Sequence, residues 1–251
     1  MNLKRNRKTQ VMGKTLKDLS FFGHMDELRN RLIKSAVAVV ISAGIVSIYI
    51  DEILEFIIKP VGKLVFTSPT DAFVAQIILI FLGGFLLALP VVLYQAWCFL
   101  ATGLKEQERT YIAIFAPFSI LLFIVGALFA YTVAIPISFQ FLLGFSSEYI
   151  VPMITIKSYI SFVGTMILAF GVIFELPIVL IFLTKIGIAT PAFLEQKRKH
   201  AIVLIFIMSA LITPPDIITQ VILSVPLIVL YEIGIICSKM VSLSKNVSKT
   251  V

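Results

Sequence analysis

Charged residues are scarce in this chain. Only 14% of its 251 residues are Asp, Glu, Lys or Arg, whereas 59% are hydrophobic, and the mean hydropathy is +1.03. A soluble domain carries about 25% charged residues to cover its surface. The composition therefore predicts an integral membrane protein.

Cysteine and histidine are also rare. Cys98 and Cys237 are too few for a disulfide framework, and His24 and His200 form no spaced set of metal ligands. The sequence GKT at 13–15 lacks the upstream glycine of a phosphate-binding loop, and no strand precedes it. We therefore expect no metal, no cofactor and no ATP binding.

The net charge of +7 does not indicate nucleic-acid binding, because the basic residues lie in short segments between long apolar runs. Such segments instead orient a chain in the membrane, since loops rich in Lys and Arg stay in the cytoplasm. Most of the 21 Lys and Arg residues fall at the N-terminus and in alternate segments after it, which leaves Lys59, Lys63 and Lys157 for the opposite loops. This asymmetry predicts that both termini are cytoplasmic.

Hydrophobic segments of two lengths predict transmembrane helices. A spanning helix needs about 20 apolar residues, and the long segments are 32–50, 73–100, 111–133 and 158–184. The fifth and sixth segments, 201–212 and 217–237, are shorter or interrupted. At 1.5 Å per residue the fifth covers only about 20 Å, so the bilayer must thin there or a polar cavity must reach inward. The sequence thus predicts an all-α membrane protein with six transmembrane helices, the last two short.

Segment 134–145 is also apolar and is a candidate for a seventh span. Counting it would move the basic cluster of Lys197, Arg198 and Lys199 to the outer side, which the distribution rule for positive charge disfavours. We therefore expect this segment to cap the outer face.

The region before the first span has its own pattern. Apolar residues recur at three- and four-residue steps through 14–32, which predicts an amphipathic helix in the cytoplasmic interface. Glu27, Arg29 and Arg31 lie on its polar side, and the simplest interpretation of Glu27 and Arg31 is a surface ion pair worth about 0.2 to 0.5 kcal/mol. The predicted divisions are a basic tail with this helix (1–31), a transmembrane domain (32–238) and a basic cytoplasmic tail (239–251).

Carboxylates recur in a short connection on the same predicted face as Glu27. Glu106 and Glu108 lie within this connection, residues 101–112. Such a segment is commonly a solvated turn. The topology also permits these carboxylates, together with Glu27, to bind two guanidinium groups through charge-assisted bonds.

Glu175 lies inside the fourth predicted span, about 14 Å from its cytoplasmic end at helical rise. A carboxyl group facing lipid at that depth is costly, so it should face the concave interior or a partner helix. The simpler alternative is a protonated carboxyl bonded to a neighbour such as Gln95 or Gln220. Asp216, which follows a double proline, is expected to cap the next helix.

Several motifs occur in an order typical of one family. Between Phe21 and Lys239 they are HMDELRNRL, ALPVVLYQAW, LKEQER, FGVIFELP, LITPPD and YEIG. Together they resemble the TatC subunit of the twin-arginine protein translocase. The resemblance implies a curved, glove-like set of six helices that recognises signal peptides with two consecutive arginines. It also implies export of folded proteins by the proton-motive force, together with the single-span subunits TatA and TatB.

The resemblance also implies roles for individual residues. Glu27 and Glu108 match the family's carboxylates that receive the arginine pair, and Glu106 and Arg29 belong to the same two motifs. Glu175 matches a glutamate of the fourth helix that would contact a partner helix or the inserting signal peptide. Asp216 matches the family's aspartate after the double proline.

A proton-coupled secondary transporter of a small solute, with Glu175 as proton relay, is the competing hypothesis. No internal repeat supports it. An intramembrane hydrolase lacks a serine or cysteine paired with a histidine or second aspartate at comparable depth. We therefore expect a non-enzymatic receptor in the bacterial inner membrane that contacts lipid, self-associates and binds no nucleic acid.

Overall fold

The computed structural model describes residues 3–62, 64–102, 104, 109–144, 152–212 and 217–247. Regular structure within these residues is helical, apart from one isolated parallel bridge between Val65 and Thr155. The elements are α1 (Leu3–Ile48), α2 (Ile50–Ile58), α3 (Pro69–Thr102), α5 (Ile112–Phe129), the π-helical turn η1 (Ala130–Ala134), α6 (Ile135–Leu143), α7 (Ile156–Phe174), α8 (Leu176–Lys185), α9 (Pro191–Gln196), α10 (Arg198–Ile212) and α11 (Ile217–Val247). The predicted all-α class is confirmed.

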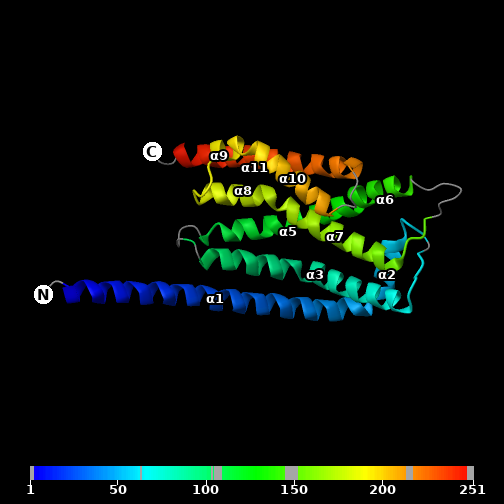
Figure 1. Cartoon of the computed structure of the whole chain (residues 1–251), viewed down its shortest axis with the longest axis horizontal. Helices are drawn as coiled ribbons and strands as arrows, with labels where there is room; N and C mark the ends of the chain where they lie inside the picture. Colours follow the sequence, from blue (N-terminus) through cyan, green and yellow to red (C-terminus); the bar gives the residue numbers. More distant parts are fainter. Residues whose placement is uncertain are drawn as a thin grey trace.

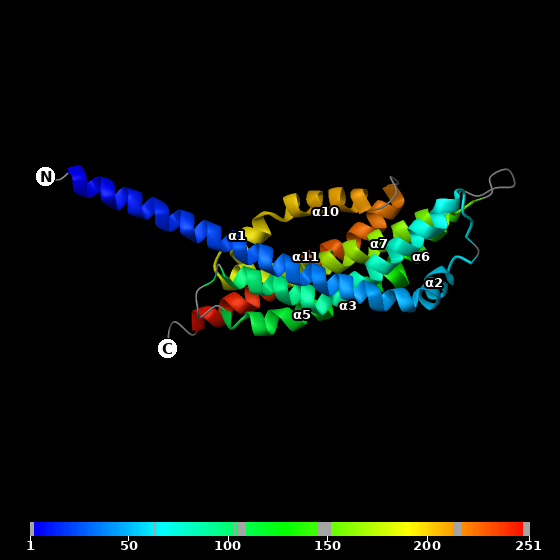
Figure 2. The ribbon, with the colours of Figure 1, turned by 90° about the horizontal axis from the view of Figure 1, so that it is seen from below.

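The long helices lie roughly side by side (Figure 1). Helices α1 and α3 form one edge, α5, α7 and α8 lie in the middle, and α10 and α11 form the other edge. The start of α1, the end of α3, the start of α5 and the end of α11 lie at one end of the bundle, and α2 lies at the opposite end. In the view from below, α10 and α5 lie on opposite sides, and the first part of α1 projects beyond the other helices (Figure 2).

Five helical stretches among the described residues are long and apolar enough to cross a membrane. They are Gly23–Ile48, Pro69–Thr102, Ala113–Leu143, Ile156–Lys185 and Leu223–Leu243, and they match the predicted spans one to four and six. Helix α10 contains the predicted fifth span and has 15 residues, which corresponds to about 22 Å. It runs antiparallel to α11 and returns the chain to the end where α2 lies (Figure 1).

The first predicted span does not begin a new helix; it is the second part of the long helix α1. It continues without interruption from Leu3 to Ile48, so the helix predicted over 14–32 is not a separate interfacial element. Residues 24–34 contain neither glycine nor proline and are rich in helix formers, so nothing ends the helix there. The expected boundary at 31–32 therefore falls inside one helix.

The sequence predicted a separate cap over 134–145, but the described part of this segment continues the preceding helix. Helices α5 and α6 are joined by η1 into one continuous stretch, so the candidate for the third span runs from Ala113 to Leu143. Pro136 lies at the start of α6 and lacks the N–H that would continue regular α-helical bonding. The wider π turn just before it accommodates the proline without ending the helix.

Helix α11 is also longer than predicted. It has 31 residues and continues through Lys239 into the expected tail, because no glycine or proline follows Gly234. Of the two last helices, only α10 is short.

Close approach between helices fixes the bundle at its centre and at its edge. Tyr159, Ile160 and Phe170 of α7 are almost fully buried. At the edge, Gly84 of α3 lets α1 approach, since a Cβ atom there would lie 2.7 Å from backbone atoms of Ala43. This contact holds α1 against α3 and thereby positions the polar residues of the two helices.

Candidate functional site

Glu27 is the first member of a polar chain that joins α1 to α3. An ion pair of 2.6 Å connects Glu27 Oε1 to Arg31 Nη2, one turn later on α1. Arg31 Nη1 in turn donates to Gln95 Oε1 of α3 at 2.7 Å. The side chains of Glu27 and Arg31 retain 34% and 22% of their exposure. The predicted pair is confirmed, and Gln95 extends it into a contact between helices.

A second contact fixes the same end of α1. His24 Nδ1 lies 3.2 Å from Thr102 Oγ1, at the end of α3. Thr102 Oγ1 donates its hydrogen to Phe99 O at 2.7 Å, which leaves the hydroxyl free to accept from the Nδ1–H tautomer of His24. Residues 24–31 of α1 are therefore held along the last turns of α3.

Some candidate residues cannot be placed relative to Glu27. Glu106, Glu108 and Asp216 lie outside the described residues. Glu106 and Glu108 follow Thr102 by four and six positions in the sequence. Arg29 is described, and its side chain is exposed.

Glu175 lies at a break in the fourth predicted span. Helix α7 ends at Phe174 and α8 begins at Leu176, while Glu175 N donates to Val172 O at 3.1 Å in a tighter turn. Pro177 explains the break, because it has no N–H to bond to the carbonyl four residues earlier. The break places a carboxyl group inside an otherwise apolar bundle.

One buried hydroxyl connects three of the helices around Glu175. Ser119 of α5 has no exposed surface; its side chain lies beside the carboxyl group of Glu175 and accepts from Trp97 Nε1 of α3 at 2.8 Å. Phe182 of α8 packs edge-on against Trp97, with ring centroids 5.0 Å apart. Glu175 Oε1 is buried and has no hydrogen-bond partner among the described residues.

Neither glutamine that the sequence suggested as a neighbour of Glu175 bonds to it. Gln95 binds Arg31, and Gln220 Nε2 donates to Phe206 O at 2.9 Å, which joins α11 to α10. The alternative based on these glutamines is wrong. Ser119 was missed because its position in the sequence carries no signal for a contact between two helices.

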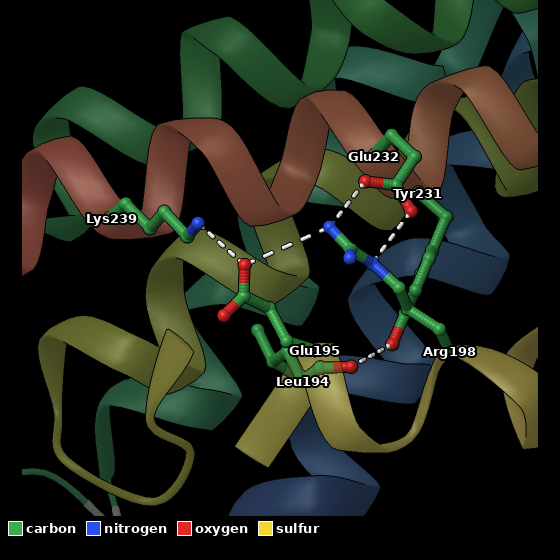
Figure 3. A network of polar contacts seen from close by, with 6 residues as sticks. All are labelled: Leu194, Glu195, Arg198, Tyr231, Glu232 and Lys239. Carbon is green, nitrogen blue, oxygen red and sulfur yellow. Dashed lines mark hydrogen bonds and ion pairs between the residues drawn. The ribbon is translucent and has the colours of Figure 1, made fainter. Parts of the chain in front are cut away.

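A further polar cluster joins α9, α10 and α11 (Figure 3). Arg198 pairs with both oxygens of Glu232, with Nε–Oε1 and Nη2–Oε2 distances of 2.9 Å. Lys239 Nζ lies 2.5 Å from Glu195 Oε1, and this hydrogen bond lowers the pKa of Glu195. The cluster ties the start of the short helix α10 to α11.

The chemistry of these sites is binding of cations and hydrogen-bond donors. Carboxylates dominate them: Glu27 is partly exposed at one end of the bundle, and Glu175 is half-buried at the break between α7 and α8, with its Oε1 buried. Among the described residues, no group of three or more His, Cys, Asp or Glu side chains is arranged to hold a metal ion.

Comparison with a family model and with individual related proteins points to one family. Residues 23–226 match the family described as TatC, Sec-independent protein translocase protein. The TatC protein of Carboxydothermus hydrogenoformans is 39% identical over 230 residues, which cover 90% of this chain and 95% of that protein. The TatC protein of Aquifex aeolicus is 40% identical over 231 residues, which cover 89% and 96%.

A solved structure agrees in three dimensions. A crystal structure described as the twin arginine translocase receptor TatC aligns with a TM-score of 0.78 and 39% identity, over 87% of this chain and 99% of that one. The family match covers well over half of the chain, and the fold is the one that the motifs imply. This chain therefore belongs to the TatC family of Sec-independent protein translocase proteins.

Proposed function

We propose that this chain is the signal-peptide receptor and core subunit of a twin-arginine translocase. It binds signal peptides with two consecutive arginines and, with TatA and TatB, exports folded proteins by the proton-motive force. The observation that carries this proposal is the partly exposed carboxylate of Glu27, which pairs with Arg31 and through it is joined to Gln95 of α3. The related crystal structure, described as a twin arginine translocase receptor, supports it.

Recognition of arginine by Glu27 follows from simple chemistry. A guanidinium group presents a planar fork of N–H donors that matches the two oxygens of a carboxylate, whereas a lysine ammonium is a point charge. Glu106 and Glu108 follow the end of α3 in the sequence and supply the carboxylates for the second arginine. Arg29 contributes to the same cytoplasmic surface, and Asp216 acts in the outer loop.

Glu175 has a different role from Glu27: it contacts a partner helix or the inserted signal peptide within the bundle. Its Oε1 is a buried acceptor with no partner among the described residues, and an unpaired acceptor in an apolar interior is costly. A hydrogen-bond donor on a partner helix or on the inserted signal peptide would relieve this cost. Gln95 and Gln220 belong to the polar contacts on either side of it, toward α1 and α10 respectively.

The receptor lies in the bacterial inner membrane with both termini in the cytoplasm. Two observations support this topology: the start of α1 and the end of α11 lie at the same end of the bundle (Figure 1), and Lys and Arg residues concentrate in the segments assigned to the cytoplasm. The short helix α10 supplies the fifth of six crossings, with local thinning of the bilayer. The receptor acts by binding, without catalysis, and self-associates.

Peptide binding to the purified chain in nanodiscs tests the receptor function. We expect a twin-arginine peptide to bind much more tightly than the same peptide with two lysines, and Glu27→Gln to abolish the difference. Glu52→Gln is the matched control, because Glu52 is an exposed carboxylate on α2 at the other end of the bundle. Equal, weak binding of both peptides by the wild-type chain would refute the receptor function.

The transporter hypothesis makes a separate prediction. Vesicles that contain only this chain would then take up protons when a solute is added. We expect no such uptake.

A further inference from the structure

We propose, on the basis of the receptor function above, that Arg31 is an internal competitor for the carboxylate of Glu27 and sets the selectivity for arginine over lysine. Its guanidinium group occupies the position on Glu27 that a peptide arginine would take. Gln95 holds Arg31 when the peptide displaces it.

The geometry around Glu27 shows the competition. Arg31 Nη2 lies 2.6 Å from Glu27 Oε1, so one of the two carboxylate oxygens is already bound to a guanidinium group. A peptide arginine binds a carboxylate best through two parallel bonds, one to each oxygen. It can make both bonds only after Arg31 has moved away.

Arg31 is poised to leave, because its own hydrogen bonds are incomplete. Its Nε is buried and has no hydrogen-bond partner among the described residues. Among the described residues, the other two guanidinium nitrogens make one contact each, to Glu27 and to Gln95. A buried donor without a partner is unfavourable, so this arrangement is less stable than a fully bonded guanidinium.

Gln95 lets Arg31 leave Glu27 without losing every partner. Arg31 Nη1 donates to Gln95 Oε1 at 2.7 Å, and Gln95 belongs to α3, the helix against which α1 packs. The amide is neutral, so it holds the displaced guanidinium without competing for the peptide as a second carboxylate would. Arg31 thus stays bound to Gln95 while the carboxylate of Glu27 becomes free to bind the peptide.

The competition favours arginine. A lysine ammonium would have to displace Arg31 from Glu27 with a point charge, whereas a peptide arginine replaces it with two aligned bonds. The positive charge of Arg31 also weakens the attraction of Glu27 for any cation nearby. Arg31 is therefore a specificity-determining residue: it excludes lysine more strongly than it weakens arginine.

Titration of the twin-arginine and twin-lysine peptides into nanodiscs holding the full chain tests this inference. We expect Arg31→Gln to tighten binding of the lysine peptide by about two- to fivefold, and of the arginine peptide by less, so that the ratio of the two affinities falls. Lys34→Gln is the matched control, since Lys34 is an exposed cation three residues further along α1. The control should leave the ratio unchanged.

The double variant Glu27→Gln/Arg31→Gln connects the effect to Glu27. If Arg31 acts only as a competitor, the double variant binds both peptides as weakly as Glu27→Gln alone. An unchanged affinity ratio in Arg31→Gln, or weaker binding of the arginine peptide, would overturn the inference while leaving the receptor function intact. Failure of the receptor function has a different signature, namely no preference for the arginine peptide in the wild-type chain.

Discussion

Trp97 and Glu175 both lie against one hydroxyl group, that of Ser119. The indole N–H of Trp97 donates to Ser119 Oγ at 2.8 Å, and the same hydroxyl lies beside the carboxyl group of Glu175. These residues come from α3, from α5 and from the break between α7 and α8. The break in the fourth predicted span is therefore tied to two neighbouring helices by a side chain with no exposed surface.

Ser119→Ala should lower the free energy of unfolding by about 1 to 3 kcal/mol, because it leaves the buried Trp97 N–H without its acceptor and removes a polar neighbour of the Glu175 carboxyl group. Thermal unfolding of the chain in detergent, followed by circular dichroism, measures the change. Ser47→Ala is the control, since Ser47 is exposed and bonds only to Gly44 O on its own helix. Equal stability of the two variants would show that the hydroxyl does not hold the helices together.

Gln95→Leu should weaken binding of the twin-arginine peptide by about two- to fivefold. Without the amide oxygen, a displaced Arg31 has no acceptor on α3, so its pairing with Glu27 becomes harder to break. Isothermal titration in nanodiscs measures the affinity. The control Gln140→Leu changes an exposed glutamine of α6 and should have no effect. Tighter binding to Gln95→Leu would contradict the role assigned to Gln95.

The Arg198–Glu232 pair should show modest coupling in a double-mutant cycle. Both side chains are substantially exposed, at 44% and 39%, and exposed pairs contribute about 0.2 to 1 kcal/mol. Thermal stabilities of Arg198→Gln, Glu232→Gln and the double variant give the coupling energy. The bidentate geometry places the expectation at the upper end of this range. Strictly additive single effects would mean that the pair does not stabilise the contact between α10 and α11.

Acidification should remove the contribution of Glu195 to stability. The hydrogen bond with Lys239 lowers the pKa of Glu195 from its ordinary value of 4.5. A carboxyl group with a lowered pKa in the folded state stabilises the fold above its unfolded pKa, and this contribution is lost as the pH falls through the lowered value. The difference in melting temperature between wild type and Glu195→Gln should be constant above about pH 5 and shrink below pH 4.5. A difference that grows on acidification would contradict this assignment.

Local patterns in the sequence predicted the parts of the fold and site that depend on local structure. The apolar runs 73–100 and 158–184 correspond to the stretches Pro69–Thr102 and Ile156–Lys185, because polar residues bound them. The Glu27–Arg31 pair was predictable since the two residues lie one helical turn apart. By contrast, Arg31 and Gln95 are 64 positions apart, and Trp97 and Ser119 are 22 apart. Only the packing of helices brings these pairs together.

Helix ends were predicted less well than helix positions. Hydropathy marks where a segment becomes polar, but a helix continues until glycine, proline or a competing contact ends it. This is why α1 begins before, and α11 ends after, the apolar segments they contain. The π turn at η1 likewise carries the helix past residue 133, where the sequence had predicted the end of the third span.

Because α1 has no break between Glu27 and Ile48, it behaves mechanically as a single rod about 32 Å long over that distance. This stretch starts at Glu27, the residue proposed to bind the peptide. It ends at Ile48, one residue before Tyr49, which leads directly into α2. A rigid-body tilt of this helix at Glu27 would therefore also move its other end, beside α2, because no break separates the two.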